Sequence, residues 1–400
     1  MKVVVLGGYG HYGRYIARKL AERGVVTTLV VAGRSLAKAQ AQADLLGAKA
    51  VAGRVDLFEE ADVPDTVRGA DLVVNATGPD HLTMIPALRL AIAAGADYCD
   101  LSISWRATEE ALAMSQDARA AGITAITGIG AFPGLFNLLA MQGVHRFDQV
   151  KAVRIGYCMS VQAAFGDPNG GAVAEPSQQG MGAALAAVVH GFSGTVRQFV
   201  DGRHADLPAF GPAYKLPLLG GGAIEVHTQG SAEPVTLPES ISGIDTVTMG
   251  AGLYPPQVNA LIKRHIDAFG SGQEEAVVAA VRKDLAANPD RWTAVVRDDV
   301  TKGESVCLEG IKDGRSARCL VEPNWNGEAF AEDASGDVVT GGPLLVASLK
   351  LLGGEIAAKG IFAPEKCFSP EPFFEDLRHE VNLFTERDGA LVTEKFEFLS

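Results

Sequence analysis

Three glycines near the start of the sequence form the pattern that best indicates a chemical function. Gly8, Gly10 and Gly13 follow an apolar run at residues 2–6 and precede a segment with helical periodicity. At this spacing the first glycine permits a tight turn, the second lets the backbone approach a pyrophosphate, and the third lets a helix pack closely on a strand. The alternative is a tight turn that binds nothing. The contact residues predicted for this dinucleotide site are Gly8, Tyr9, Gly10, His11, Tyr12 and Gly13.

The end of the second predicted strand indicates which dinucleotide binds. A site specific for NAD places Asp or Glu there, about 20 residues after the glycines, to bind the ribose hydroxyls. This chain has Arg34 and Ser35 instead. A guanidinium and a hydroxyl suit a 2′-phosphate, so NADP(H) is expected in preference to NAD(H). The alternative is that Arg34 faces solvent or pairs with Asp56.

Further cofactor contacts are expected at the ends of later strands, because ligands bind outside the carboxyl ends of strands in open α/β sheets. Asp56 follows the third predicted strand, and we expect it near the adenine. The fourth ends in NATGP. Asn75, Thr77, Gly78 and Pro79 are predicted to lie along the ribose and nicotinamide.

Hydride transfer also needs a proton donor and an oriented substrate. Asp100, at the end of the fifth predicted strand, is placed for proton transfer, although it could instead cap the next segment. His81 is a second candidate acid, with a solvated loop histidine as the alternative. An anionic substrate would need a cation in the second domain, where Arg154 is a candidate unless it is an ordinary surface charge. The five cysteines show no CxxC or His-rich pairing, so no metal site is expected.

These residues are positioned by a regular alternation of strands and helices. Short glycine-bearing connections between them predict an α/β fold, an N-terminal Rossmann domain with a doubly wound parallel sheet. Strands are expected at 2–6, 27–33, 49–53, 72–78, 97–102 and 123–128, with helices at 14–24, 35–46, 82–94 and 107–121.

The pattern changes after about residue 147. Short strands and turns predict an α+β domain with a largely antiparallel sheet, including hairpins at Asp201-Gly202 and Lys312-Asp313-Gly314. The Gly/Pro-rich stretch at 166–180 lacks periodicity and is interpreted as a loop or lid. Tyr157, Tyr254 and Trp325 could line an apolar pocket, or belong to the core or an interface.

Composition bounds the function. The 400 residues carry a formal charge of −13, which repels polyanions, so nucleic acid is not an expected partner. No uninterrupted apolar stretch is long enough to cross a bilayer, and the apolar run at the start is too short for a secretory signal. Scattered, unpaired cysteines suit a reducing compartment. We expect a cytoplasmic protein without membrane insertion.

The segments VVLGGYGHYGR, VVAGRS, NATGP, AIAAGADYCDLS and ARAAGITAITGIGAFPGLFNLLA together resemble the saccharopine dehydrogenase-like NADP-binding proteins over about residues 1–145. A weaker similarity at 340–365 resembles the segment with which those proteins return to the nucleotide domain. The family includes saccharopine and carboxynorspermidine reductases and trans-acting enoyl reductases. The resemblance implies a Rossmann domain at 1–130, rejoined by about 340–400, and a substrate and dimerisation domain at 131–340.

The resemblance also implies site residues and a function. It places Asp100, Ser102 and the turn at 128–134 around the nicotinamide and the substrate. Amino-acid-forming members tend to carry an acidic residue before the Pro-Gly pair, where this chain has Phe132; a more apolar substrate is therefore allowed. The expected protein is a homodimeric NADP(H)-dependent oxidoreductase acting on an imine or activated C=C of a small molecule. The alternative is a non-catalytic NADP-binding or redox-sensing protein. The residues implied here are Gly130 for the cofactor, and Ser102, Phe132, Pro133 and Gly134 for the substrate.

Overall fold

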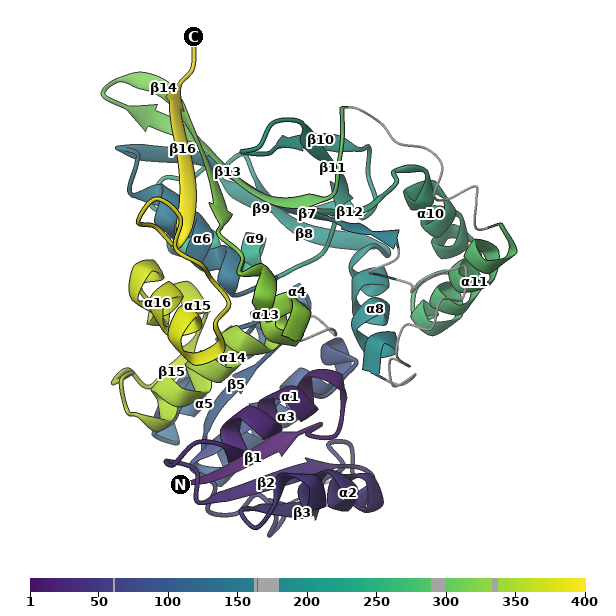
Figure 1. The fold of residues 1–400 in the computed structure, drawn as a ribbon, viewed down its shortest axis with the longest axis vertical. Coiled ribbons are helices and arrows are strands. Elements are labelled where there is room, and N and C mark those ends of the chain that lie inside the picture. Colours follow the sequence, from purple (N-terminus) through teal and green to yellow (C-terminus); the bar gives the residue numbers. More distant parts are fainter. Residues whose placement is uncertain (60–61, 162–163, 165–179, 289–298, 333–336) are drawn as a thin grey trace. The chain divides into compact units, whose positions relative to one another are not determined.

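A computed structural model describes residues 1–400 except 60–61, 162–163, 165–179, 289–298 and 333–336. The chain divides into two compact units (Figure 1). Unit 1 comprises Met1–Leu138 and Trp325–Thr385, and unit 2 comprises Leu139–Asn324 and Glu386–Ser400. Each unit is built around its own β-sheet.

Unit 1 contains a seven-stranded parallel sheet in the order β15-β6-β5-β4-β1-β2-β3. The six N-terminal strands thus have the Rossmann order 3-2-1-4-5-6, which reverses direction between β1 and β4. The predicted parallel sheet is confirmed. Its strands are β1 (Lys2–Leu6), β2 (Thr28–Gly33), β3 (Ala50–Arg54), β4 (Leu72–Asn75), β5 (Asp97–Asp100), β6 (Thr124–Ile126) and β15 (Gly360–Phe362).

Helices cover both faces of this sheet. On one face, Met84 and Leu88 of α3 pack with Val4, Val73 and Tyr98 in a continuous apolar core. On the other, α14 contacts α1, β4 and β5. The predicted helix at 107–121 is two helices, α4 and α5. The helices of unit 1 are α1 (His11–Ala21), α2 (Leu36–Leu46), α3 (Asp80–Ala94), α4 (Trp105–Ala113), α5 (Ser115–Ala120), α13 (Gly327–Glu332), α14 (Asp337–Leu352), α15 (Pro364–Cys367) and α16 (Pro370–Val381), and α6 (Leu135–Val144) crosses the division between the units.

Unit 2 contains a nine-stranded sheet with the path β10-β11-β12-β7-β13-β14-β16, to which β8 and β9 are added beside β12. The sheet is mixed, because β7 pairs with β12 in parallel and with β13 antiparallel. The strands are β7 (Gln149–Ser160), β8 (Thr195–Val200), β9 (Arg203–Pro208), β10 (Tyr214–Pro217), β11 (Ala223–Thr228), β12 (Thr246–Tyr254), β13 (Gly303–Lys312), β14 (Arg315–Pro323) and β16 (Val392–Phe398); the helices are α8 (Gly180–Gly191), α9 (Glu233–Thr236), a 3₁₀ turn (Leu237–Glu239), α10 (Gln257–Phe269) and α11 (Glu274–Ala287).

Both predicted hairpins occur in unit 2. Strands β8 and β9 turn at Asp201-Gly202, and β13 and β14 turn at Asp313-Gly314, with positive φ at all four residues. Such a pair of left-handed residues matches the twist of the flanking strands.

The compact units have other bounds than the predicted domains. The units divide at 138/139, 324/325 and 385/386 rather than at 130 and 340. Residues 386–400, which we expected in the nucleotide domain, belong to unit 2, because β16 pairs over its whole length with β14, from Phe398–Ala317 to Val392–Pro323. The pairing partner is about 75 residues away in sequence, a separation that local patterns do not report.

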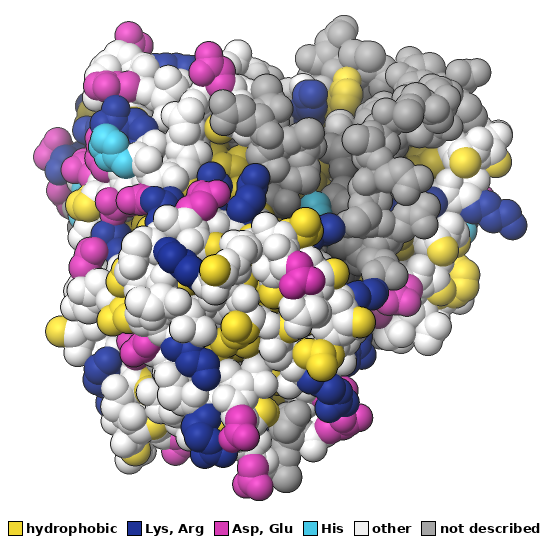
Figure 2. All heavy atoms as spheres, turned by 60° about the horizontal axis from the view of Figure 1, so that its bottom comes forward, with side chains coloured by type: hydrophobic (Ala, Val, Ile, Leu, Met, Phe, Trp, Pro, Cys, Tyr) yellow, Lys and Arg dark blue, Asp and Glu magenta, His cyan; other side chains and the backbone are white. Residues whose placement is uncertain are grey.

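The stretch at 166–180 interpreted as a lid lies almost entirely outside the described residues. Among the helices that the structure describes, none combines the length and apolar character needed to cross a membrane. Figure 2 shows acidic and basic side chains interspersed over the described part of one face.

Candidate cofactor and active site

The polar residues predicted from separate strands meet at one edge of the unit 1 sheet. Leu6 at the end of β1 is level with Asn75 at the end of β4, and Asn75 is level with Asp100 at the end of β5. The carboxyl ends of these parallel strands therefore share one edge, beside the β1–β4 reversal where nucleotides bind in this fold.

The glycine loop fits a close backbone approach. A Cβ on Gly13 would lie 2.0 Å from the carbonyl oxygen of Gly7, and one on Gly10 would lie 3.0 Å from the same atom. The Gly10 N–H donates to that oxygen at 2.7 Å, which closes the turn. Gly10 is also the N-cap of α1 and offers no side-chain cap to the helix. The first turn of α1 is therefore suited to an anion such as a pyrophosphate.

Tyr9 links this loop to the end of β2. Its phenol oxygen accepts a hydrogen bond from the Ser35 N–H at 3.0 Å. A Cβ on Gly33 would lie 2.6 Å from that same phenol oxygen, so the glycine makes room for the ring. Ser35 in turn caps α2, since its hydroxyl accepts the Lys38 N–H at 3.3 Å. These contacts bring Tyr9 and Ser35 together, as expected for one cofactor site.

Arg34 is exposed at the tip of β2. The guanidinium that lies near Asp56, at 4.0 Å, belongs to Arg54. Arg54 also pairs with Glu59 at 2.6 Å. Asp56 itself accepts the Phe58 N–H at 3.2 Å and so shapes the turn after β3.

The turn after β4 is fixed from both sides. Asn75, which is buried, accepts hydrogen bonds from the Thr77 N–H at 3.1 Å and the Thr77 hydroxyl at 2.5 Å. The Thr83 hydroxyl lies 3.2 Å from the Thr77 carbonyl and 3.1 Å from that of Pro79. Asn75 donates to the Tyr98 phenol oxygen at 3.1 Å. The segment Thr77–Gly78–Pro79 is thus held in one conformation.

Asp100 is 1% exposed and joins two loops. Its Oδ1 accepts the Ser102 N–H at 2.9 Å and the Gly128 N–H at 2.8 Å. Its Oδ2 is buried. Burial raises the pKa of Asp100 to about 6, against the lowering effect of the two backbone N–H groups and of a hydrogen bond with the neighbouring Tyr98 phenol. Part of the capping alternative is therefore realised.

Asp80, which the sequence reasoning missed, holds the loop after β5. Its Oδ2 accepts from the Ser102 hydroxyl at 3.0 Å and from the N–H groups of Ile103 and Ser104, each at 2.9 Å. The Ser102 hydroxyl also accepts a hydrogen bond from the Ser104 N–H at 3.3 Å. Ser102 as a whole residue is 2% exposed. Ser102 therefore fastens the loop, and its predicted substrate contact stays a prediction.

The turn at 128–134 depends on its glycines. Gly128 and Gly134 have positive φ, and a Cβ on Gly134 would lie 2.5 Å from the Gly130 carbonyl oxygen. The Gly130 N–H donates to the Pro133 carbonyl at 2.9 Å. Phe132 stacks on Phe136 with a centroid separation of 3.9 Å. The residues predicted here thus form one compact turn.

Buried Asn137 fastens this turn to the returning C-terminal segment. Its Oδ1 accepts the Gly134 N–H at 2.9 Å, and its Nδ2 donates to Glu365 at 3.0 Å. Both Asn137 and Glu365 are buried. The sequence offered no signal for this pairing, which spans 228 residues.

The other two predicted residues have ordinary surroundings. His81 lies half-buried in the first turn of α3, next to Asp80. Arg154, in unit 2, donates to Glu309 on the neighbouring strand β13 at 2.7 Å. A substrate anion would have to displace this carboxylate, so the surface-charge alternative is the simpler interpretation of Arg154.

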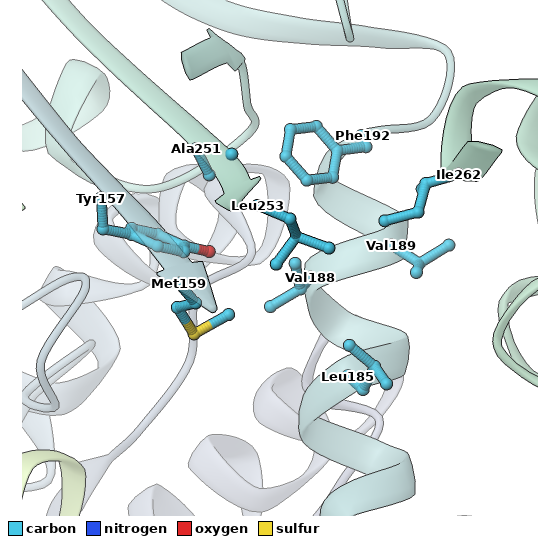
Figure 3. Close-up of a pocket in the computed structure, with 10 residues that line it drawn as sticks. Tyr157, Met159, Leu185, Val188, Val189, Phe192, Ala251, Leu253 and Ile262 are labelled. Carbon is cyan, nitrogen blue, oxygen red and sulfur yellow. The ribbon is translucent and has the colours of Figure 1, made fainter. Parts of the chain in front are cut away.

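Unit 2 contains a small apolar pocket between β7, β12, α8 and α10 (Figure 3). Tyr157, Leu253, Val188 and Phe192 face its interior, with Met159 beside Tyr157. Gln229 donates to the Tyr157 phenol oxygen at 3.0 Å. The remaining space is about that of one water molecule, so the pocket as it stands is mainly core packing. Trp325 is half-buried and packs on Phe384, with the ring centroids 5.4 Å apart.

The fold and the carboxyl-edge site define a dinucleotide-binding domain joined to a mixed-sheet domain, as in two-domain dehydrogenases. Residues 3–126 match the family model of the saccharopine dehydrogenase NADP binding domain. The N-terminal domain is therefore an NADP-binding domain of the saccharopine dehydrogenase type, which confirms the predicted resemblance and cofactor.

Individual relatives agree with this family. A carboxyaminopropylagmatine dehydrogenase from Synechocystis is 27% identical over 174 residues, 40% of this chain and 42% of that protein. A putative trans-acting enoyl reductase from Mycobacterium tuberculosis is 32% identical over 104 residues, 25% of each chain. The matches thus span less than half the length of these curated relatives.

A solved structure also matches the fold of the whole chain. Apo saccharopine dehydrogenase (L-Glu forming) from Saccharomyces cerevisiae matches 99% of both chains with a TM-score of 0.62 and 17% identity. This likeness confirms the predicted fold class, a doubly wound parallel sheet joined to an α+β domain. At this identity it carries no information about the substrate.

Proposed function

We propose that this protein is an NADP(H)-dependent oxidoreductase that reduces, or forms by oxidation, an imine or an activated C=C of a small metabolite. The observation that carries the proposal is the shared carboxyl edge of the parallel sheet. Leu6, which precedes the glycine loop, is level with Asn75, and Asn75 is level with Asp100. NADP(H), when bound, donates or accepts a hydride. The names of two relatives, a dehydrogenase and an enoyl reductase, support this chemistry.

The chain's own residues would bind and orient the reactants. Gly8, Gly10 and Gly13 let the backbone and the α1 N-terminus approach the pyrophosphate. Arg34 and the Ser35 hydroxyl would bind the 2′-phosphate, since a planar guanidinium matches a phosphate in charge and geometry. The rigid turn Thr77–Pro79 would support the nicotinamide side.

Asp100 is our candidate proton donor. Burial raises its pKa to about 6, so its carboxyl group can carry a proton near neutral pH. Both backbone N–H groups donate to Oδ1, so Oδ2 is our candidate position for the proton. Because the group is buried, we propose that an ordered water carries the proton to the acceptor nitrogen or carbon. His81 is the second candidate for this role.

Steady-state NADPH oxidation tests the proposal with two panels, one of 2-oxo acids combined with amines and one of 2-enoyl thioesters. Turnover with one panel would identify the acceptor class. If neither panel is turned over, nor the reverse reaction with secondary amines and NADP⁺, the catalytic proposal fails. The non-catalytic alternative, an NADP-binding sensor, would then be favoured.

A further inference from the structure

One carboxylate joins the turn after β4 to the loop after β5. Asp80 is the first residue of α3, directly after Pro79. Its Oδ2 accepts hydrogen bonds from three successive residues, namely the Ser102 hydroxyl at 3.0 Å and the Ile103 and Ser104 N–H groups at 2.9 Å. Hydrogen bonds to an ionised acceptor are roughly twice as strong as neutral ones. This single atom therefore fixes the loop.

The cofactor side of Asp80 is equally constrained. The Thr83 hydroxyl, one turn along α3, bonds the carbonyl groups of Thr77 and Pro79 at 3.2 and 3.1 Å. Ahead of this turn, a Cβ on Gly7 would lie 2.7 Å from the Ala76 carbonyl oxygen. The glycine loop thus packs directly on the chain that leads to Asp80.

The substrate side continues the same network. Asp100 bonds the N–H groups of Ser102 and Gly128, at 2.9 and 2.8 Å. A Cβ on Gly128 would lie 3.1 Å from the Ser102 carbonyl oxygen. The loop that Asp80 holds is therefore in contact with the turn at 128–134, and the path from the glycine loop to that turn is continuous.

We propose that Asp80 is a positioning residue that couples occupation of the NADP site to the conformation of the loop at 102–104 and, through it, the turn at Gly128. Binding at the glycine loop and the Thr77–Pro79 turn would stabilise the start of α3, and Asp80 would transmit this order to the substrate side. The proposal rests on the NADP site and not on the proposed reaction. This coupling can be measured directly at both loops.

Amide hydrogen exchange of the full chain, with and without NADPH, provides this measurement. We expect NADPH to protect peptides that contain Ile103, Ser104 and Gly128. In Asp80→Ala these peptides should exchange about tenfold faster without cofactor, since a hydrogen bond to a charged group is lost, and they should gain little protection from NADPH. Asp80→Asn keeps one acceptor oxygen and should restore part of the coupling.

Asp71→Ala is the matched control, because Asp71 also accepts a backbone N–H, that of Lys2 at 2.7 Å, at the opposite end of β4. It should leave the NADPH-induced protection intact. NADPH affinity, measured by fluorescence titration, should change little in Asp80→Ala. Absence of NADPH-induced protection in the native chain, or its retention in Asp80→Ala, would overturn the coupling. Abolished NADPH binding in both Asp80→Ala and Asp80→Asn would overturn it too, by making Asp80 a direct cofactor ligand.

Discussion

The carboxylate of Asp100 accepts a hydrogen bond from the Gly128 N–H at 2.8 Å. This contact ties the end of β5 to the start of the turn at 128–134, and Gly128 adopts a positive φ there. The two segments that the family resemblance implied around the nicotinamide and substrate are thus one hydrogen-bonded assembly within unit 1. Its ionisable centre is a buried carboxyl group with an unusual pKa.

That pKa predicts how stability depends on pH. Because burial raises the pKa of Asp100 from 3.8 to about 6, the folded protein binds this proton more tightly than the unfolded chain. The contribution of Asp100 to the free energy of unfolding should therefore fall as the pH rises between these values and stay low above them. The loss is on the order of 3 kcal/mol.

Asp100→Asn should remove this component. At pH 7 the variant should be as stable as the native chain or more stable, and the gain should vanish near pH 4. Urea unfolding at several pH values measures the gain in stability at pH 7 and its loss near pH 4. Asp71→Asn, at an exposed site, is the control. Equal pH dependence in Asp100→Asn and the native chain would contradict the assignment.

Gly13→Ala should abolish NADPH binding. The added Cβ would lie 2.0 Å from the Gly7 carbonyl oxygen, a backbone atom that cannot move without opening the loop. Gly24→Ala is the matched control, since a Cβ there meets no atom within 4 Å. Fluorescence titration with NADPH, alongside thermal unfolding, separates loss of the site from loss of the fold. Native affinity in Gly13→Ala would show that the cofactor does not use this loop.

Arg34→Ala should weaken NADPH binding far more than NADH binding, by about tenfold or more, because a charge-assisted contact to the 2′-phosphate is lost. Arg89→Ala removes another exposed guanidinium of unit 1, one that pairs with Glu110 on α4, and should change neither affinity. Parallel titrations with both nucleotides give the ratio. Equal losses for NADPH and NADH in Arg34→Ala would contradict the phosphate assignment.

Asn137→Ala should destabilise the turn at 128–134. It leaves the buried Gly134 N–H without its acceptor and Glu365 without its amide donor, at a cost of about 1–3 kcal/mol for each unsatisfied group. Gln40→Ala, which removes an exposed amide bonded to Asp44, should cost far less. Chemical unfolding compares the two. A similar loss in both variants would show that the Asn137 contacts add nothing.

The strand ends that form the candidate cofactor site could be predicted from sequence, because their determinants are local. Gly8, Gly10 and Gly13 lie within one strand–turn–helix unit, and Arg34 and Asn75 end strands that the apolar pattern identifies. The level alignment of these strand ends follows from parallel pairing.

Contacts between distant segments could not be predicted. In the sequence, Asp80 is an ordinary acidic residue in the first turn of a predicted helix. Its contact with Ser102 exists only because the fold brings the two segments together. The bond between Asn137 and Glu365 and the pairing of β16 with β14 depend likewise on segments far apart in the chain. Burial also had to be observed, since the raised pKa of Asp100 follows from its surroundings and not from its sequence neighbours.

Hydride transfer by this protein is tested most directly with NADPH deuterated at C4 of the nicotinamide. Mass spectrometry of the products from the imine and enoyl panels would detect the label. We predict one deuterium on the reduced carbon of an accepted substrate, from one of the two C4 positions. Tight NADPH binding with no deuterated product from either panel, and no reduction of NADP⁺ by the corresponding amines, would contradict it.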